Sequence, residues 1–314
     1  MLSYLARRLL TIVPVLLGIT VIAYFLTRTI PGDAVAILLG TQNDPVVAAQ
    51  LRHNLHLDQP VILGYFDWLS QVLRGHLGQS IRSGADIGPD LVQRFARSAQ
   101  LSLAAIMLAV LVGIPAGIAA AVRRNRWPDQ LISVAALLGI STPDFWLGTI
   151  LVLVFSLQLQ WLPPAGYVPP SSGLLPFLKV LLLPALTLGL QIASIITRFT
   201  RAAMLDVLTQ DYVRTARAKG QTQHRIFYGH ALKNAAIPIL TVIGLNFGFL
   251  LGGTVIVETI FSWPGVGNLV LTAINQRDYP VVQACVMLFA ITFTLINLAI
   301  DLLYGLVDPR VRYS

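Results

Sequence analysis

The stretch Asp211–Pro238, DYVRTARAKGQTQHRIFYGHALKNAAIP, is the longest charged segment between two apolar runs in the second half of the chain. It predicts a helix over Asp211–Lys219, a stop at Gly220 and a second helix over Thr222–Lys233. Glycine suits the position after a helix because it adopts the left-handed backbone conformation without steric cost. This basic elbow is typical of a surface that projects from a membrane and docks on a partner. From the residues alone, a solvated loop that only fixes topology is an equally good interpretation.

The composition indicates a membrane protein with several spans. Of the 314 residues, 55% are hydrophobic and 11% are charged, whereas soluble domains carry about 25% charged residues. Lys and Arg collect on cytoplasmic loops of such proteins, so the net charge of +8 does not indicate nucleic-acid binding. The single cysteine, Cys285, excludes an intrachain disulfide and a cysteine-based metal site.

Six apolar stretches are long enough to cross the hydrocarbon core, which takes roughly 20 residues of helix. We expect helices because a spanning segment must satisfy its own backbone hydrogen bonds. The first stretch follows two arginines but lacks a small-residue cleavage site, so we interpret it as a retained helix and not a signal peptide. The fold class is therefore an all-α integral membrane protein with six transmembrane helices. They are Leu9–Thr29, Ala99–Val122, Leu131–Leu157, Leu178–Phe199, Ala235–Val257 and Val281–Val307.

The distribution of arginine predicts the orientation. The short loops 158–177 and 258–280 contain Arg277 as their one strong base. The positive-inside rule therefore places the elbow and both termini in the cytoplasm. The arginines on that side are Arg7, Arg8, Arg123, Arg124, Arg126, Arg198, Arg201, Arg310 and Arg312, together with those of the elbow.

The long outer segment Pro31–Ser98 is expected to carry two helical pieces. Val46–Leu55 has the pattern of a short amphipathic helix, and an aromatic cluster follows at Tyr65, Phe66 and Trp68. Trp and Tyr commonly lie at headgroup depth, so this cluster predicts a helix on the outer membrane surface.

Small residues at a spacing of four mark the fifth span. Gly244, Gly248 and Gly252 predict a face where another helix approaches closely, in the pore or against a partner subunit, and Asn246 lies between them. The alternative is that glycine is simply frequent in membrane helices. Gly113 and Gly117 repeat the spacing once, which is a weaker signal.

Motifs for catalysis and ion coupling are missing from the sequence. No G-x-x-x-x-G-K-[ST] loop is present, so the chain is not expected to hydrolyse ATP. His53 and His56 are a weak metal signal without a third ligand, and no metal site is predicted. Almost no acid lies at membrane depth, which disfavours a proton-coupled carrier. Asp144 is near the start of a span, Glu258 is at an outer boundary, and Asp301 is toward the inner part of the last span.

With these features in place, the chain resembles the permease subunits of binding-protein-dependent ABC importers. It is most similar to the B-type subunit of the dipeptide, oligopeptide and nickel branch. The likeness extends over nearly the whole chain through several motifs in order. They are Arg7-Arg8-Leu9, Ile30-Pro-Gly-Asp33, Arg126-Trp-Pro-Asp129, Arg198-Phe-Thr-Arg201, Asp211-Tyr212, Arg214–Gly220, His230–Asn234, Val257–Gly267, Arg277–Pro280 and Asp308–Tyr313.

The resemblance implies a type I importer permease fold in a bacterial or archaeal cytoplasmic (inner) membrane. The implied partners are a second homologous permease, two ATPase subunits and an extracytoplasmic solute-binding protein. No cofactor is expected in this chain, and ATP and Mg would bind the ATPases. The implied domains are 1–94, the first helix and outer segment; 95–307, the transmembrane domain with a coupling elbow at about 206–234; and 308–314, a cytoplasmic tail.

The resemblance also assigns two groups of site residues. Residues expected to couple to the ATPase are Asp211, Tyr212, Arg214, Thr215, Ala216, Arg217, Ala218, Lys219, Gly220 and His230. Residues expected to face the binding protein are Trp263, Pro264, Gly265, Arg277 and Asp278. The wider superfamily has Glu-Ala-Ala where this chain has Arg214-Thr-Ala216, so no role of that glutamate transfers to this chain.

The implied function is ATP-driven import of dipeptides, oligopeptides or peptide-like solutes such as glutathione. A nickel-chelate or other small-solute importer of the same family is the first alternative. An ion-coupled secondary transporter is an alternative of a different class, and the scarcity of buried charge and the basic elbow both speak against it.

Overall fold

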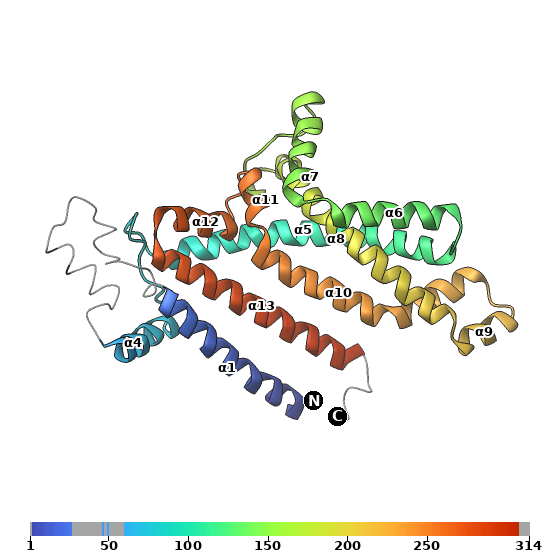
Figure 1. The fold of residues 1–314 in the computed structure, drawn as a ribbon, viewed down its shortest axis with the longest axis horizontal. Coiled ribbons are helices and arrows are strands. Elements are labelled where there is room, and N and C mark those ends of the chain that lie inside the picture. The colour runs from blue at the N-terminus through green and yellow to red at the C-terminus, as the bar shows by residue number, and fades with distance from the viewer. Residues whose placement is uncertain (1, 27–45, 47–48, 50–59, 308–314) are drawn as a thin grey trace.

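The computed structural model describes residues 2–26, 46, 49 and 60–307, and this part of the chain is almost wholly helical (Figure 1). One isolated bridge, between Gln79 and Asp86, is the β pairing found there. Three predicted features lie outside the described residues. They are the 30–33 motif, the 308–314 tail and the helix predicted over 46–55, of which only residues 46 and 49 are described. The helices are α1 (Leu2–Leu26), α4 (Val61–Leu73), α5 (Ile87–Val122), α6 (Trp127–Ser141), α7 (Asp144–Leu151), α8 (Leu174–Leu208), α9 (Asp211–Ala218), α10 (Leu232–Gly253), α11 (Val255–Ile260), α12 (Val266–Gln276) and α13 (Tyr279–Val307).

Four of the described helices, α5, α8, α10 and α13, are long and apolar enough to cross a membrane. They match the second, fourth, fifth and sixth predicted spans. In α1, the apolar part with described side chains is Leu10–Phe25, which is shorter than a full span. The total of six therefore stays a prediction.

The third predicted span, Leu131–Leu157, is not one straight helix. It divides into α6 and a second piece, α7 followed by a π-helical turn over Val152–Gln158, and the two pieces meet at 103°. Thr142 precedes Pro143 and has an extended ψ of 122°. A proline ring disfavours the helical conformation of the residue before it, which explains why the helix ends here. If this pair counts as one bent span, the described residues contain five.

The core forms where α5 and α8 lie side by side (Figure 1). A Cβ atom added to Gly113 would lie 2.8 Å from the Ala193 carbonyl oxygen, so the backbones touch without a side chain between them. Gly117 meets Thr197 and Thr200 in the same way. The glycine pair with the weaker sequence signal therefore makes a close backbone contact between α5 and α8.

The glycines of the fifth predicted span face a neighbour within the same chain. Gly244 and Gly248 lie against Ile300 and Ile296 of α13, whereas nothing lies within 4 Å of a Cβ built on Gly252. The Asn246 amide donates to the Val242 carbonyl of its own helix at 2.7 Å. Gly244 and Gly248 thus pack closely on α13 of the same chain, and a role of these glycines in the pore or against a partner subunit stays a prediction.

The outer aromatic cluster lies on a helix, as predicted. Tyr65 and Trp68 of α4 both contact Tyr24 near the end of α1, with ring centroids 5.5 Å apart in each pair. Tyr65 also shares a hydrogen bond of 2.8 Å with the Thr20 hydroxyl. These contacts attach α4 to α1.

The described elements next to the predicted cytoplasmic arginines lie toward one side of the molecule. In Figure 1 the start of α1, the α5–α6 connection, α9 and the end of α13 all lie toward one side, and α4 and α12 lie toward the other. The predicted orientation requires this arrangement, and the assignment of the α9 side to the cytoplasm stays a prediction.

Candidate functional site

The α9 helix is a short amphipathic helix at one end of the molecule (Figure 1). Val213 is fully buried and Ala216 is 8% exposed, and both pack with the buried Ile226. The remaining predicted coupling residues with described side chains are exposed: Asp211, Tyr212, Arg214, Thr215, Arg217, Ala218, Lys219 and Gly220. A docking role for the Ala216 side chain is therefore wrong, because it anchors α9 to its own chain. The side chain of His230 lies outside the described residues.

Gly220 ends α9 as predicted. Its φ is 74°, in the left-handed region. Its N–H donates to the Arg217 carbonyl at 3.0 Å, and the Gln221 N–H donates to the Ala216 carbonyl at 3.2 Å. This pair of bonds is the Schellman motif, in which a left-handed residue satisfies the last carbonyls of a helix. The end of α9 is thus held by backbone geometry and not by side chains.

The second half of the elbow differs from the prediction. Thr222–Lys233 is not a separate short helix, because a π-helical turn over Arg225–Ala231 continues directly into α10. No residue between these segments interrupts the helix, and Pro238 is accommodated inside α10. The Asn234 amide of α10 donates to the Tyr212 hydroxyl of α9 at 3.0 Å. This hydrogen bond attaches α9 to α10.

Near the same end, two motifs that are separate in the sequence form one ion pair. Arg201 of α8 donates to both carboxylate oxygens of Asp129 of α6, at 2.6 and 2.8 Å. The Asn125 N–H adds a third bond at 2.9 Å, and Asp129 is only 3% exposed. A bidentate arginine fixes the geometry of the two helices it joins. The two motifs were not paired from the sequence, and the available signal was an acid three residues after Arg126, the last arginine of an arginine-rich turn.

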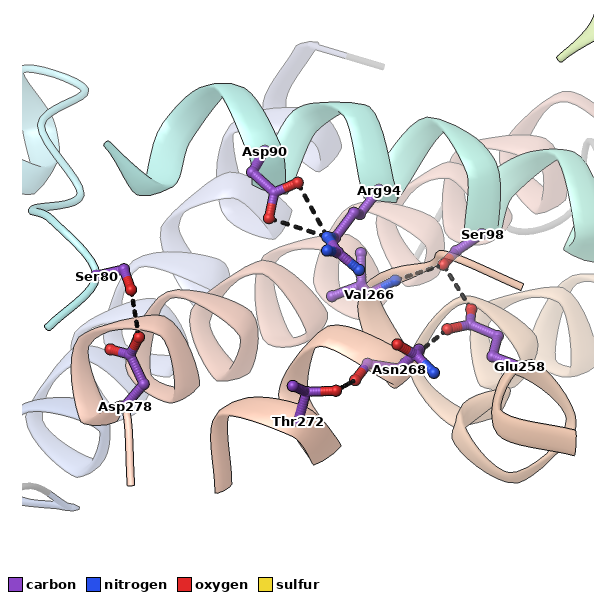
Figure 2. Close-up of polar contacts among 9 residues, drawn as sticks. All are labelled: Ser80, Asp90, Arg94, Ser98, Glu258, Val266, Asn268, Thr272 and Asp278. Atoms are coloured by element: carbon purple, nitrogen blue, oxygen red, sulfur yellow. Dashed lines mark hydrogen bonds and ion pairs between the residues drawn. The ribbon is translucent and has the colours of Figure 1, made fainter. Parts of the chain in front are cut away.

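At the opposite end, Glu258 forms a buried hydrogen-bonded hub (Figure 2). One carboxylate oxygen accepts from the Ser98 hydroxyl at 2.6 Å, and the other accepts from the Asn268 N–H at 2.8 Å. The Ser98 oxygen in turn accepts the Val266 N–H at 2.9 Å. Burial raises the pKa of Glu258, and its hydrogen bonds from Ser98, Asn268 and Thr254 oppose that rise. The hub ties α11 and the first turn of α12 to α5.

The residues next to this carboxylate must be small. A Cβ atom on Gly265 would overlap both the Glu258 carboxylate and the Ser98 hydroxyl. Gly267 is similarly limited, because its Cβ would lie 2.9 Å from a Glu258 oxygen. The glycines of the Trp-Pro-Gly-Val-Gly segment therefore serve internal packing.

Most residues predicted to face a binding protein are not available for that contact. Trp263 is fully buried, and its indole N–H donates to the Arg97 carbonyl at 2.9 Å. Asp278 is 3% exposed and accepts hydrogen bonds from Ser80 and from the Ile81 N–H (Figure 2). The prediction that Trp263, Gly265 and Asp278 face the binding protein is wrong in this structure, because all three residues are buried. Pro264 is half-buried, and Arg277 is the one exposed member.

Comparisons with known proteins agree with this architecture. The model of the family described as binding-protein-dependent transport system inner membrane component matches residues 113–313, and that of its N-terminal part matches residues 1–101. The chain is 43% identical over 314 residues, the full length of both proteins, to the glutathione transport system permease protein GsiC of Salmonella typhimurium strain LT2. The same permease of Escherichia coli strain K12 is 42% identical over the full length.

Solved structures share the fold at low sequence identity. The MetNI methionine ABC transporter, in an inward-facing conformation, matches with a TM-score of 0.60 and 18% identity, over 70% of this chain and 96% of that chain. An amino acid ABC transporter matches with a TM-score of 0.52 and 14% identity, over 75% and 96% of the two chains. The family models and the full-length relatives show that the chain belongs to the binding-protein-dependent ABC transporter permeases, the membrane components of such transport systems.

Proposed function

We propose that this chain is one of two permease subunits in an ATP-driven importer of small peptides, with glutathione as the first solute to test. Full-length relatives at 43% identity are named as glutathione permeases, which supports this solute class. The ATP would be hydrolysed by separate subunits, and a solute-binding protein would deliver the peptide from outside.

The α9 helix is the observation that carries the coupling part of the proposal. Its apolar side is buried, because Val213 and Ala216 pack on Ile226, and its polar side is exposed at the end of the molecule. A helix anchored in this way fits into a groove on another protein without losing its place on its own chain. Because α9 packs on Ile226, in the segment that continues into α10, and the Tyr212 hydroxyl accepts from Asn234 of α10, closure of the ATPases would tilt α9 and α10 together.

Affinity purification followed by an activity assay tests the proposal. The tagged chain is expected to co-purify from mild detergent with a second permease and ATPase subunits. In proteoliposomes, that complex is expected to import glutathione or a short peptide under one condition. ATP must be supplied on the side of the membrane that the ATPase subunits face, and the binding protein must be present on the other side. Uptake that needs an ion gradient and no ATP would overturn the proposal in favour of a secondary transporter.

A further inference from the structure

The outer part of α5 carries a cation that has no acidic partner among the described residues. Arg97 is half-buried, and the ion pairs found there involve Arg94, Arg201 and Arg214 instead. Arg94, about one turn earlier on the same helix, is neutralised by Asp90 at 2.9 Å (Figure 2). Partial burial of a charge without a counter-ion costs free energy, and an anionic ligand would offset that cost.

Arg97 is nevertheless held in a defined place. Its guanidinium carbon lies 4.8 Å from the centroid of the Tyr167 ring, which is the geometry of a cation–π contact. The Tyr167 ring meets the buried Trp263 ring edge-on, with centroids 4.9 Å apart. Trp263 in turn is bonded through its indole N–H to the Arg97 carbonyl. Aromatic groups therefore position the guanidinium without neutralising it.

Gln100 adds further donors beside Arg97. The two residues are three apart on α5, so their side chains lie on the same face of the helix. The Gln100 carbonyl oxygen accepts from the Tyr167 hydroxyl at 3.4 Å, and the NH₂ group of the same amide supplies two further donors. A guanidinium fork with an adjacent amide NH₂ matches the geometry of a carboxylate.

We propose that Arg97, Gln100 and Tyr167 form a binding site for a carboxylate of the transported peptide. Arg97 lies just before the predicted span Ala99–Val122, where a solute that arrives from outside first meets the membrane helices. The inference rests on the proposed function and narrows its solute class to peptides with a free carboxylate. The Glu258 hub one residue away, at Ser98, keeps this part of α5 in place against α11 and α12.

The test compares two solutes in the complete transporter. Proteoliposomes containing the full complex, with its binding protein, are given glutathione or trialanine, whichever the wild type imports, and the fully amidated analogue of that peptide. Arg97→Gln is expected to lower the uptake efficiency for the free acid about tenfold and for the amide less than about twofold. Because each solute is compared between wild type and variant, the preference of the binding protein cancels.

Three further variants separate a solute contact from a structural one. Arg97→Lys keeps the charge and is expected to restore part of the free-acid uptake, whereas Arg97→Met keeps the packing on Tyr167 and is not. Arg94→Gln removes a neutralised arginine from the same helix and is expected to leave the ratio of the two solutes unchanged.

The outcomes that overturn the site are distinct from those that overturn the importer. Equal loss for both solutes, no loss for either, or no difference between Arg97→Lys and Arg97→Met would each overturn the carboxylate site. Equal loss with fewer co-purified subunits would instead assign Arg97 to a subunit contact. Failure of the wild-type complex to import any peptide would overturn the proposed function before Arg97 is considered.

Discussion

Gly220 has a φ of 74°, a backbone conformation that costs other residues about 1–2 kcal/mol. Gly220→Val is therefore expected to unwind the end of α9, because the Schellman bonds depend on that conformation. We expect less solute imported per ATP hydrolysed, at a normal level of inserted protein. Gly220→Asn is the control, since asparagine tolerates the left-handed region better than other residues. Wild-type coupling in Gly220→Val would show that coupling does not depend on the backbone conformation that ends α9.

Gly113 and Gly252 are both helical glycines with opposite surroundings. A Cβ atom on Gly113 would lie 2.8 Å from the Ala193 carbonyl oxygen, whereas one on Gly252 meets nothing within 4 Å. Gly113→Ala is expected to separate α5 from α8 and lower the free energy of unfolding by about 1–3 kcal/mol. Gly252→Ala is expected to leave it unchanged or slightly higher. Thermal unfolding of both variants in the same detergent is the measurement, and equal midpoints would contradict the packing argument.

Single residues were predictable from the sequence where a local rule decides their conformation. The role of Gly220 follows from helix-ending geometry, which depends only on neighbouring residues. Trp263 was misplaced, because its assignment to the binding-protein surface came from the resemblance and not from its own surroundings. Its pocket is made by Arg97, Tyr167 and Phe177, which come from distant parts of the chain. No local pattern reports such a contact.

The joint between α6 and α8 depends on the ion pair of Asp129 with Arg201. Removing one partner of a buried pair leaves an unpaired charge, and the side chain of Arg201 is 30% exposed, which moderates the cost. Asp129→Ala is expected to lower the free energy of unfolding by about 2–3 kcal/mol, below the range for fully buried pairs. Asp129→Ala with Arg201→Met is expected to cost less than the sum of the single changes. Asp211→Ala, which removes a highly exposed partner of Arg214, is the control and is expected to have no measurable effect. Additive losses would contradict the pairing.

Whole elements were predicted well where one property decides them. The spans α5, α8, α10 and α13 follow from length and hydropathy alone. Hydropathy averages over a window, so it joined α6 and α7 into one span although Pro143 marks the break. The second half of the elbow was predicted as a helix separate from α10 for a similar reason. The sequence changes there from charged to apolar, but the helix continues across the change.

For the whole molecule, α9 and the 159–173 loop are expected to lie on opposite sides of the membrane. The one native cysteine, Cys285, is fully buried, so the wild-type chain is expected to resist a membrane-impermeant maleimide and serves as the control. Ala218→Cys places a thiol on the exposed side of α9, and Ser171→Cys places one on an exposed position of the 159–173 loop. We expect labelling of Ser171→Cys in intact cells and of Ala218→Cys only in inverted vesicles. Added ATPase subunits are expected to protect Ala218→Cys alone, because only α9 would lie in their groove. Labelling of Ala218→Cys in intact cells would show that the predicted orientation is reversed. Labelling of Ala218→Cys that persists with bound ATPase would show that α9 does not lie in the contact with the ATPase.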